Sequence, residues 1–424
     1  MTTAVATGAP ASSRVPVRSW KAVIAFGVFA LLAVVLFVLL GRDGTSSFRL
    51  AAGDDFVALP DLPFPTRPTG VAVAVVLVAL TVLAAVMTRA ARRIPLWLST
   101  VFALVFLVGF LVWASAGATL PVPGLLLGTV GLATPLIFGS LGGVISERVG
   151  VVNVAIEGQL LAGAFTAAMI GSLTQQPILG LVAAMIASVL VSFVLAAFAI
   201  KYVVDQVIVG VVLNVLVTGL TSFLYSQVLT ADAATFNSPE KFERLAIPVL
   251  SRVPIIGSVL FNQTVIVYLM YLAIFAVWWG LFKTKWGLRL RAVGEHPQAA
   301  DTVGIDVART RFWNVSLAGA IAGMGGAYYT LDAVGAFGKE MTAGAGFIAL
   351  AAVIFGRWDP IRATLASLLF GFATNLQNVL GVIGSPVPSE FMLMLPYIVT
   401  IFAVAGLVGQ SRGPAAAGKP YLKS

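Results

Sequence analysis

Long apolar runs alternate with short polar segments along nearly the whole chain. Many of these runs approach or exceed the roughly 18 to 20 residues that a helix needs to cross a bilayer. The pattern predicts an all-α polytopic membrane protein with about 10 to 12 transmembrane helices in one bundle. The predicted spans are residues 20–40, 70–88, 95–114, 124–145, 155–173, 177–200, 204–225, 264–282, 312–331, 345–356, 361–382 and 390–409.

One of these runs is too short to cross a membrane by itself. Residues 345–356 form a compact apolar stretch that follows a glycine-rich segment. The stretch is therefore re-entrant or includes part of residues 335–344.

Composition supports this class and excludes several kinds of chemistry. Of the 424 residues, 59% are hydrophobic and 10% are charged, whereas a soluble domain carries about 25% charge. A β-barrel would show short alternating segments instead of continuous apolar runs. The chain has no cysteine and only one histidine, His296, which excludes disulfides, thiolate catalysis and Cys- or His-rich metal sites.

No motif for ATP binding or catalysis is present in the sequence. The nearest match to a Walker A loop, residues 335–341, has Ala333 where the first glycine is required and Glu340 after the lysine. The stretch 344–349 mimics a dinucleotide-binding glycine pattern, but it opens an apolar run, which indicates helix packing. We therefore expect no catalytic residue, metal site or cofactor belonging to this chain.

The basic residues predict how the chain is threaded through the membrane. With the N-terminus inside, 19 of the 26 Lys and Arg residues lie in or beside inner segments, and seven lie outside. Cytoplasmic loops carry an excess of these residues, so both termini are predicted to be cytoplasmic. The same bias accounts for the net charge of +9 without a nucleic-acid partner. The first run lacks a small-x-small cleavage site, which favours a retained span over a signal peptide.

This threading divides the chain into four regions. They are a cytoplasmic disordered tail at 1–19, N-terminal spans at 20–123 with an external loop at 41–69, a core at 124–409 with a cytoplasmic loop at 283–311, and a cytoplasmic tail at 410–424. Prolines in the loop 41–69 oppose regular helix. A second outer segment, 226–263, has room for a short helix.

Uncharged amides are the better candidates for contact with a polar solute, because no span carries a central carboxylate with the partners that a proton relay needs. An amide hydrogen-bonds a solute without the cost of a buried charge. Hydrogen bonding between helices is the alternative role. The candidate substrate-pathway residues are Asn153, Glu157, Gln159, Asn214, Asn375, Gln377 and Asn378. The aromatic candidates for stacking on a solute are Phe337, Phe347 and Phe372, although most of the 27 phenylalanines are expected to serve packing.

The loop 283–311 contains a predicted short helix. Pro297 suits a first helical turn, residues 298–303 complete roughly two turns, and Gly304 is well placed to end the helix. A helix this short is not stable alone, so it must dock on lipid headgroups, on the bundle or on a partner protein.

The composition of this short helix favours a partner protein. Ala299 and Ala300 offer a flat, small surface, and Glu295 and Asp301 offer charges that can meet basic residues. A helix that lies on lipid has large apolar residues and a Lys- or Arg-rich polar face, and this helix has neither.

Four motifs in order give the chain a resemblance to ABC importer permeases. The stretch "QAADTVG", 298–304, is similar to their E-A-A-x-x-x-G pattern, with Gln298 in place of the glutamate. The stretches "ERVGVVNVAIEGQLLAGAF" (147–165), "DQVIVGVVLN" (205–214) and "FGRWDPIRATLASLLFG" (355–371) resemble segments of purine-nucleoside importer permeases. The resemblance covers residues 124–409, and Asp205 and Gln206 depart from the family pattern.

The resemblance implies a role for the short helix and a set of partners. The helix would be a coupling helix that seats in a cleft of a separate cytoplasmic ATPase, which would bind ATP and Mg²⁺. A second, related permease would complete the pathway, and an external substrate-binding lipoprotein would deliver a nucleoside. The setting implied is a bacterial plasma (inner) membrane. The implied coupling residues are Gly294, Glu295, His296, Pro297, Gln298, Ala299, Ala300, Asp301 and Gly304.

Other functions stay open from the sequence. Sugars and branched-chain amino acids are alternative substrates within the same branch of permeases. A stand-alone secondary transporter would show inverted repeats and ion-coupling groups, and a non-transporting membrane scaffold is a third reading. Dependence of uptake on the ATPase separates an ABC importer permease from a secondary transporter and from a scaffold.

Overall fold

The computed structural model describes residues 19–53, 55–92, 94–384, 388, 390, 394 and 413–422. Within these residues, nine helices are long and apolar enough to span a membrane. This confirms the prediction of a polytopic α-helical protein. Residues 1–18 of the predicted tail 1–19 and nearly all of the predicted span 390–409 lie outside the described residues. The chain forms two compact units, one from residues 1–48 and 62–120 and the other from 49–61 and 121–424.

The first unit is a three-helix bundle with a small sheet. Its helices are α1 (Lys21–Ala33), continued by η1 (Val34–Leu39), α2 (Thr66–Arg89) and α3 (Leu96–Ala114), and its strands are β1 (Thr45–Arg49), β2 (Leu62–Pro65) and β3 (Thr119–Pro121). The strand order is β2-β1-β3. Phe26 and Phe102 stack in its core, with ring centroids 4.3 Å apart. Nine residues of the predicted loop 41–69 are strand, which an extended proline accommodates where a helix would not, and its last four residues begin α2.

The second unit contains the remaining long helices. They are α4 (Val122–Arg148), α5 (Ile156–Thr174), α6 (Pro177–Ala196) with η2 (Ala197–Lys201), α7 (Gln206–Leu224) with η3 (Tyr225–Leu229), α10 (Val265–Lys283), α13 (Val307–Tyr328) with η5 (Tyr329–Ala333), and α15 (Pro360–Val382). The shorter elements are α8 (Ala233–Phe236), β4 (Arg244–Ala246), η4 (Leu250–Arg252), α9 (Ile256–Leu260), β5 (Asn262–Thr264), α11 (Lys285–Glu295), α12 (Pro297–Thr302) and α14 (Ala345–Phe355).

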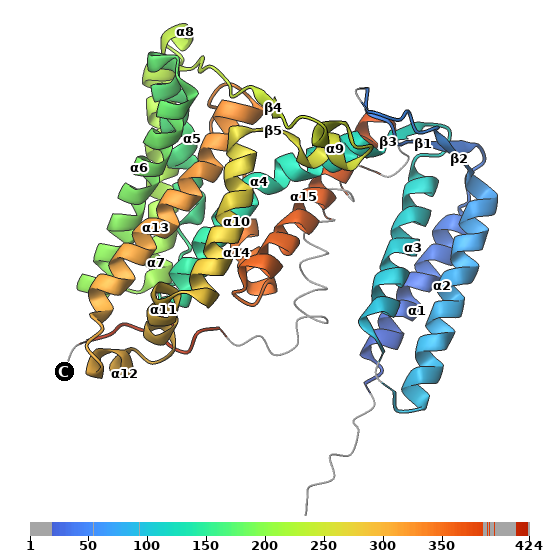
Figure 1. Ribbon diagram of the computed structural model, residues 1–424, viewed down its shortest axis with the longest axis horizontal. Helices are drawn as coiled ribbons and strands as arrows, with labels where there is room; N and C mark the ends of the chain where they lie inside the picture. The colour runs from blue at the N-terminus through green and yellow to red at the C-terminus, as the bar shows by residue number, and fades with distance from the viewer. Residues whose placement is uncertain are drawn as a thin grey trace, which may run out of the picture. The chain divides into compact units, whose positions relative to one another are not determined.

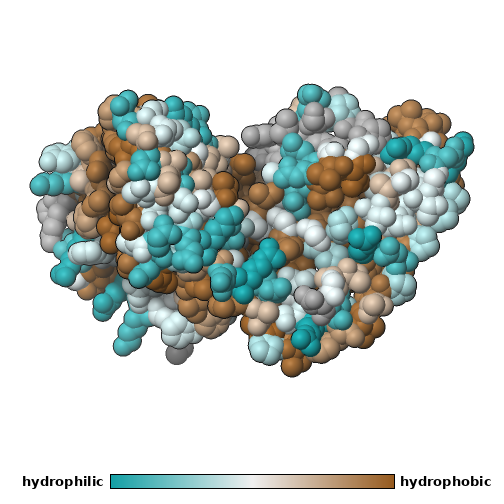
Figure 2. Space-filling view, turned by 90° about the horizontal axis from the view of Figure 1, so that it is seen from above, coloured by the Kyte–Doolittle hydropathy of each residue, from teal (hydrophilic) through white to brown (hydrophobic). Residues whose placement is uncertain are grey.

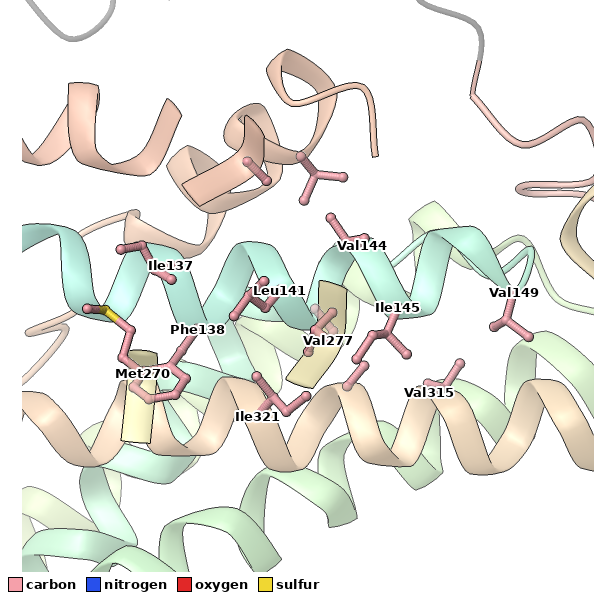
Figure 3. Close-up of a cluster of buried hydrophobic side chains, with 14 of the residues drawn as sticks. Ile137, Phe138, Leu141, Val144, Ile145, Val149, Met270, Val277, Val315 and Ile321 are labelled. Atoms are coloured by element: carbon pink, nitrogen blue, oxygen red, sulfur yellow. The ribbon is translucent and has the colours of Figure 1, made fainter. Parts of the chain in front are cut away.

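Helix α13 lies inside this unit, where it packs against α4, α5 and α6 (Figure 1). Figure 3 shows side chains of α4, among them Phe138, Leu141 and Ile145, directed toward Ile321 and Val315 of α13. Thirteen of the 22 residues of α13 are buried. Helix α13 is rich in glycine and polar residues, so it is less hydrophobic than the nine apolar spans. This composition is typical of a helix that contacts protein rather than lipid.

Glycine sets how closely these helices approach. A Cβ at Gly326 of α13 would collide with the carbonyl oxygen of Leu160 in α5 and lie 2.8 Å from the amide nitrogen of Ala164. Gly142 of α4 meets the backbone of Ala318 in the same way, with a would-be contact of 2.6 Å. The backbones of α4, α5 and α13 are therefore in contact, which small residues permit in membrane proteins.

The two predicted outer segments contact each other within the second unit. The amide of Phe56 donates to the carbonyl of Arg252 at 2.9 Å, and the Arg252 guanidinium lies 5.7 Å from the Phe56 ring centroid. The segment 226–263 contains α8 and α9, which confirms the expectation of a short helix there. Figure 2, the view from above relative to Figure 1, shows hydrophilic and hydrophobic residues intermixed on the surface.

We predict that Gly326→Ala lowers stability although alanine is the better helix former. The new methyl group has no space between α13 and α5, and overpacking of this kind costs roughly 1 to 3 kcal/mol. Thermal unfolding in detergent measures the effect. The matched control is Gly27→Ala in α1, where nothing lies within 4 Å of the added Cβ and helix propensity favours alanine by about 1 kcal/mol. A stabilising effect at both positions would contradict the packing described here.

Candidate functional site

An open cavity of about 560 Å³ lies beside the middle of α7 in the second unit. This volume falls within the roughly 300 to 1,000 Å³ that is usual for small-molecule sites. The wall is built from α5, α7, the segment before α14 and the first turn of α14. The lining residues are Glu157, Leu161, Val211, Asn214, Val215, Thr218, Gly219, Glu340, Thr342, Ala343, Gly344 and Phe347.

Glu157 joins the start of α5 to the start of α14. One carboxylate oxygen accepts from the Thr342 hydroxyl at 2.6 Å and from the Gly344 amide at 2.9 Å. The other accepts from the Gly346 amide at 2.6 Å. The carboxylate therefore satisfies backbone donors at the N-terminus of α14, where a negative charge is favoured. This largely buried acid anchors the re-entrant helix.

The segment before α14 is held in an unusual backbone conformation. Glu340 and Ala343 adopt left-handed φ values of 53° and 45°, and Gly344 follows at 83°. Non-glycine residues in this region store strain and persist where surrounding contacts hold them. Here the contacts with Glu157 hold the segment, and all three residues line the cavity. With 11 residues, α14 confirms the expectation that the run 345–356 is too short to cross a bilayer alone.

Asn214 contributes to the cavity wall and also ties α7 to the start of α5. Its side-chain oxygen accepts from the Gly158 amide at 2.8 Å, and its amide donates to the Val154 carbonyl at 2.9 Å. One N–H and one lone pair of the side chain are left for other partners. Of the seven predicted pathway residues, the structure brings Glu157 and Asn214 together at the cavity.

The other predicted pathway residues are not among the described lining residues of this cavity. Asn153 donates to Gln159 at 3.1 Å, and Gln159 donates to the Ser192 hydroxyl at 2.9 Å, so both amides join helices in the interior. Asn375 is buried and donates to the Leu125 carbonyl at 2.6 Å. Gln377 is half-buried and Asn378 is exposed.

The three aromatic candidates fall in different environments. Phe347 lines the cavity and is 49% exposed. Phe337 is buried and packs edge-on against Phe165, and Phe372 is half-buried in α15. Sequence reasoning did not single out Thr218, Thr342 or Glu340 as wall residues. The glycine at 344 was a signal for two of them, because a left-handed turn before a short helix places Glu340 and Thr342 near its N-terminus.

The charge of the cavity wall is negative. Among the described lining residues, Glu157 and Glu340 are acidic and none is Lys, Arg or His. Asn214, Thr218 and Thr342 supply neutral polar groups, and Phe347 supplies an aromatic face. A wall of this kind disfavours anionic groups and can hydrogen-bond and stack with a neutral polar solute.

A second feature is the short helix α12 in the loop 283–311. It runs from Pro297 to Thr302, and Gly304 follows with φ of 85°. Both ends agree with the prediction from sequence. The structure differs at Ala300, which is buried with 3% exposure, while Ala299 is exposed. The expectation that the two alanines share one outer surface was therefore wrong for Ala300, because that side faces the rest of the chain.

The exposed side of this region carries several of the predicted coupling residues. Glu295, His296, Gln298, Ala299 and Gly304 are exposed, and Pro297 and Asp301 are partly so. Gly294 is buried, and a Cβ there would collide with the carbonyl oxygen of Arg148. Gly294 thus permits α11 to approach the end of α4.

The turn between α14 and α15 meets the same end of α4. Arg357 and Trp358 have left-handed φ values of 53° and 55°. Trp358 donates from its indole nitrogen to Glu147 at 2.5 Å, and Arg148 donates to the Trp358 carbonyl at 2.9 Å. These contacts lock the turn against the end of α4.

The C-terminal segment Gly413–Leu422 runs alongside α11 and α12 (Figure 1). The Ala416 amide donates to the Gly294 carbonyl at 2.9 Å. The Tyr421 hydroxyl donates to Asp301 in α12 at 3.0 Å. Desolvation raises the pKa of the Tyr421 phenol, and its hydrogen bond to Asp301 raises it further, so the phenol keeps its proton at neutral pH.

Comparison with known proteins decides the family. The profile of the family described as "Branched-chain amino acid transport system / permease component" matches residues 125–404. The chain belongs to this permease family.

Several curated relatives of the permease are named as ABC transporter permease proteins. A guanosine ABC transporter permease protein of Bacillus subtilis is 42% identical over 70% of this chain and 95% of its own length. A nucleoside ABC transporter permease protein of Lactococcus lactis is 42% identical over 69% of this chain and 94% of its own. A putative glucose ABC transporter permease protein of Haloferax volcanii is 36% identical over 60% of this chain and 77% of its own. No solved structure matches.

The permease is thus the multi-pass membrane component of an ABC transporter, a transport subunit rather than a catalytic one. Permeases of this family work with an ATPase and a substrate-binding protein.

We predict that Glu157→Gln destabilises the permease. Glutamine retains one acceptor oxygen and places an NH₂ group against backbone donors, so the hydrogen bonds to one half of the carboxylate are lost. Loss of a charged hydrogen bond costs about 1.5 to 3 kcal/mol. Thermal unfolding in detergent measures the change. Glu240→Gln, at an exposed position, is the control, and equal melting temperatures for the two variants would show that Glu157 does not anchor α14.

Proposed function

We propose that this permease carries nucleosides into the cell and forms half of the translocation pathway, with a second, related permease as the other half. The observation that carries the proposal is the cavity beside α7, where an exposed aromatic ring, neutral polar groups and acidic residues line one wall. The names of the guanosine and nucleoside relatives, each 42% identical to this chain, support the same solute class.

The chemistry of the cavity distinguishes among the substrates of related permeases. An amino acid has a carboxylate, which needs a cation or several N–H donors, and the described lining residues include no Lys, Arg or His. A nucleoside is neutral, has a base that can stack on Phe347 and has hydroxyl groups that can bond to Thr218, Thr342 or Asn214. A sugar shares the hydroxyl groups but has no extended aromatic face. The cavity therefore favours a nucleoside.

The exposed face of α12 is the proposed contact with the cytoplasmic ATPase. A helix of six residues owes its stability to what it packs against, and here Ala300 packs inward while Gln298 and Ala299 face outward. The partner subunit would bind ATP and Mg²⁺, and its change of shape on hydrolysis would move α12 and switch the access of the cavity. An external lipoprotein would deliver the nucleoside.

The excess of Lys and Arg in the inner segments supports an orientation with both termini and α12 in the cytoplasm. The setting proposed is a bacterial plasma (inner) membrane. In this orientation, the outer segments 41–69 and 226–263 face the substrate-binding lipoprotein.

We predict that Phe347→Leu raises the KM for nucleoside uptake. Loss of stacking on a base costs about 1 to 3 kcal/mol, so KM should rise by roughly five- to 150-fold. ATP-driven uptake into vesicles that contain the full transporter measures KM. Phe223→Leu, at a 61% exposed position of α7, is the control. Uptake that continues without ATP, or competition by leucine rather than by nucleosides, would refute the proposed function.

A second prediction concerns the contact with the ATPase. Ala299→Arg places a long cation on the exposed face of α12 without entering the core, so we expect the ATPase to stop co-purifying and ATP-driven uptake to be lost. Ala234→Arg, at an exposed position of α8, tests whether any surface arginine has this effect. Retention of the ATPase by the Ala299 variant would exclude α12 as the contact.

A further inference from the structure

The C-terminal segment, Gly413–Leu422, contacts three consecutive helices, α11, α12 and α13. Its Ala416 amide bonds to the last turn of α11 at Gly294, and its Ala415 amide donates to the Glu295 carboxylate at 3.2 Å. Tyr421 bonds to Asp301 within α12. The Lys419 carbonyl accepts from Arg311 of α13 at 3.0 Å.

Packing supports these hydrogen bonds. Ala416 is buried with 5% exposure, and Tyr421 packs against the hydrophobic core. Gly413 lies against the ring of Trp358, where a Cβ would be 3.0 Å from the nearest ring atom. The segment thus contacts both the elements around α12 and the turn between α14 and α15, which is locked to α4.

Arg311 gives the segment a specific electrostatic role. Its side chain is 2% exposed, and within the described part of the chain it forms no salt bridge. Two of its three nitrogens, Nε and Nη2, have no hydrogen-bond partner among the described residues. The Lys419 carbonyl is the partner of the third. A buried cation without partners is costly, so the backbone of the C-terminal segment stabilises the inner end of α13.

We propose that the C-terminal segment is a strap that positions α12 relative to α11 and α13, with Tyr421 and Arg311 as its positioning residues. Helix α12 has only six residues and lies between the bend at His296 and the glycine at 304, so few of its own contacts fix its orientation. With the strap in place, a push on α12 moves α11, α13 and the end of α4 together. The strap therefore determines how much of the movement that the ATPase causes in α12 is transmitted to the cavity. This inference rests on the proposed contact between α12 and the ATPase.

The test is the number of ATP molecules hydrolysed for each nucleoside transported by the full transporter in vesicles. Tyr421→Phe removes one hydroxyl group and leaves the ring in place. We expect this ratio to rise about fivefold, the change that corresponds to about 1 kcal/mol of lost coupling between α12 and its neighbours, while the amount of bound ATPase stays unchanged. Tyr202→Phe is the matched control, because Tyr202 is 62% exposed and follows η2.

A second pair of variants tests the role of Arg311. Removal of residues 413–424 leaves the buried guanidinium without its carbonyl partner, so this truncation should lower the melting temperature. The same truncation combined with Arg311→Met, which removes the charge at similar size, should lower it much less. Equal losses with and without the arginine would overturn the electrostatic part of the inference.

The outcomes separate the strap from the proposed function. If Ala299→Arg releases the ATPase but Tyr421→Phe leaves the ratio of ATP to nucleoside unchanged, the strap is refuted and the contact at α12 stands. A drop in bound ATPase with Tyr421→Phe would also refute the strap, since it would make the tyrosine part of the docking surface. If Ala299→Arg has no effect, the proposed contact fails first.

Discussion

The close approach of α13 to α4, α5 and α6 is the constraint on which the second unit depends. Lipid is as apolar as the side chains, so helices associate through van der Waals contact and interhelical hydrogen bonds. Glycines such as Gly326 and Gly142 bring the backbones together, and the Ser188 hydroxyl of α6 donates to the Gln159 carbonyl of α5 at 2.6 Å, which joins two of the helices that surround α13. Because these helices are fixed, the segments around residues 150–155 and 334–344 can adopt non-helical conformations. The cavity forms where Glu157 joins these two segments.

The end of the second unit that carries α11 and α12 is built from short segments that support one another. The segments there are short, and none has enough apolar area to hold its place alone. They are joined by backbone carbonyls and a few side chains, in particular Arg148, Arg311 and Trp358. Helix α12 joins this network through the hydrogen bond between Asp301 and Tyr421, and the C-terminal segment in turn bonds to Arg311 of the long helix α13.

Features set by local chemistry could be predicted from the sequence, and features set by distant partners could not. Apolar runs became helices, and Pro297 and Gly304 bound α12 where their backbone preferences place them. By contrast, the donors to Glu157 lie 185 to 189 residues away along the chain, and no local pattern pairs them. The inward side of α12 at Ala300 depends on neighbouring elements as well. The amides of Asn153 and Gln159 satisfy each other, which residue type alone does not reveal.

The attachment of α14 has a consequence for how the cavity wall can move. Three donors, from Thr342, Gly344 and Gly346, share one carboxylate. A rotation of that single group about its side-chain bonds breaks all three hydrogen bonds at once. The cavity wall and the half-helix are therefore held by one side chain, and loss of that carboxylate would remove all three attachments together. The segment with the strained residues Glu340 and Ala343 would lose the contacts that hold its backbone in the same event.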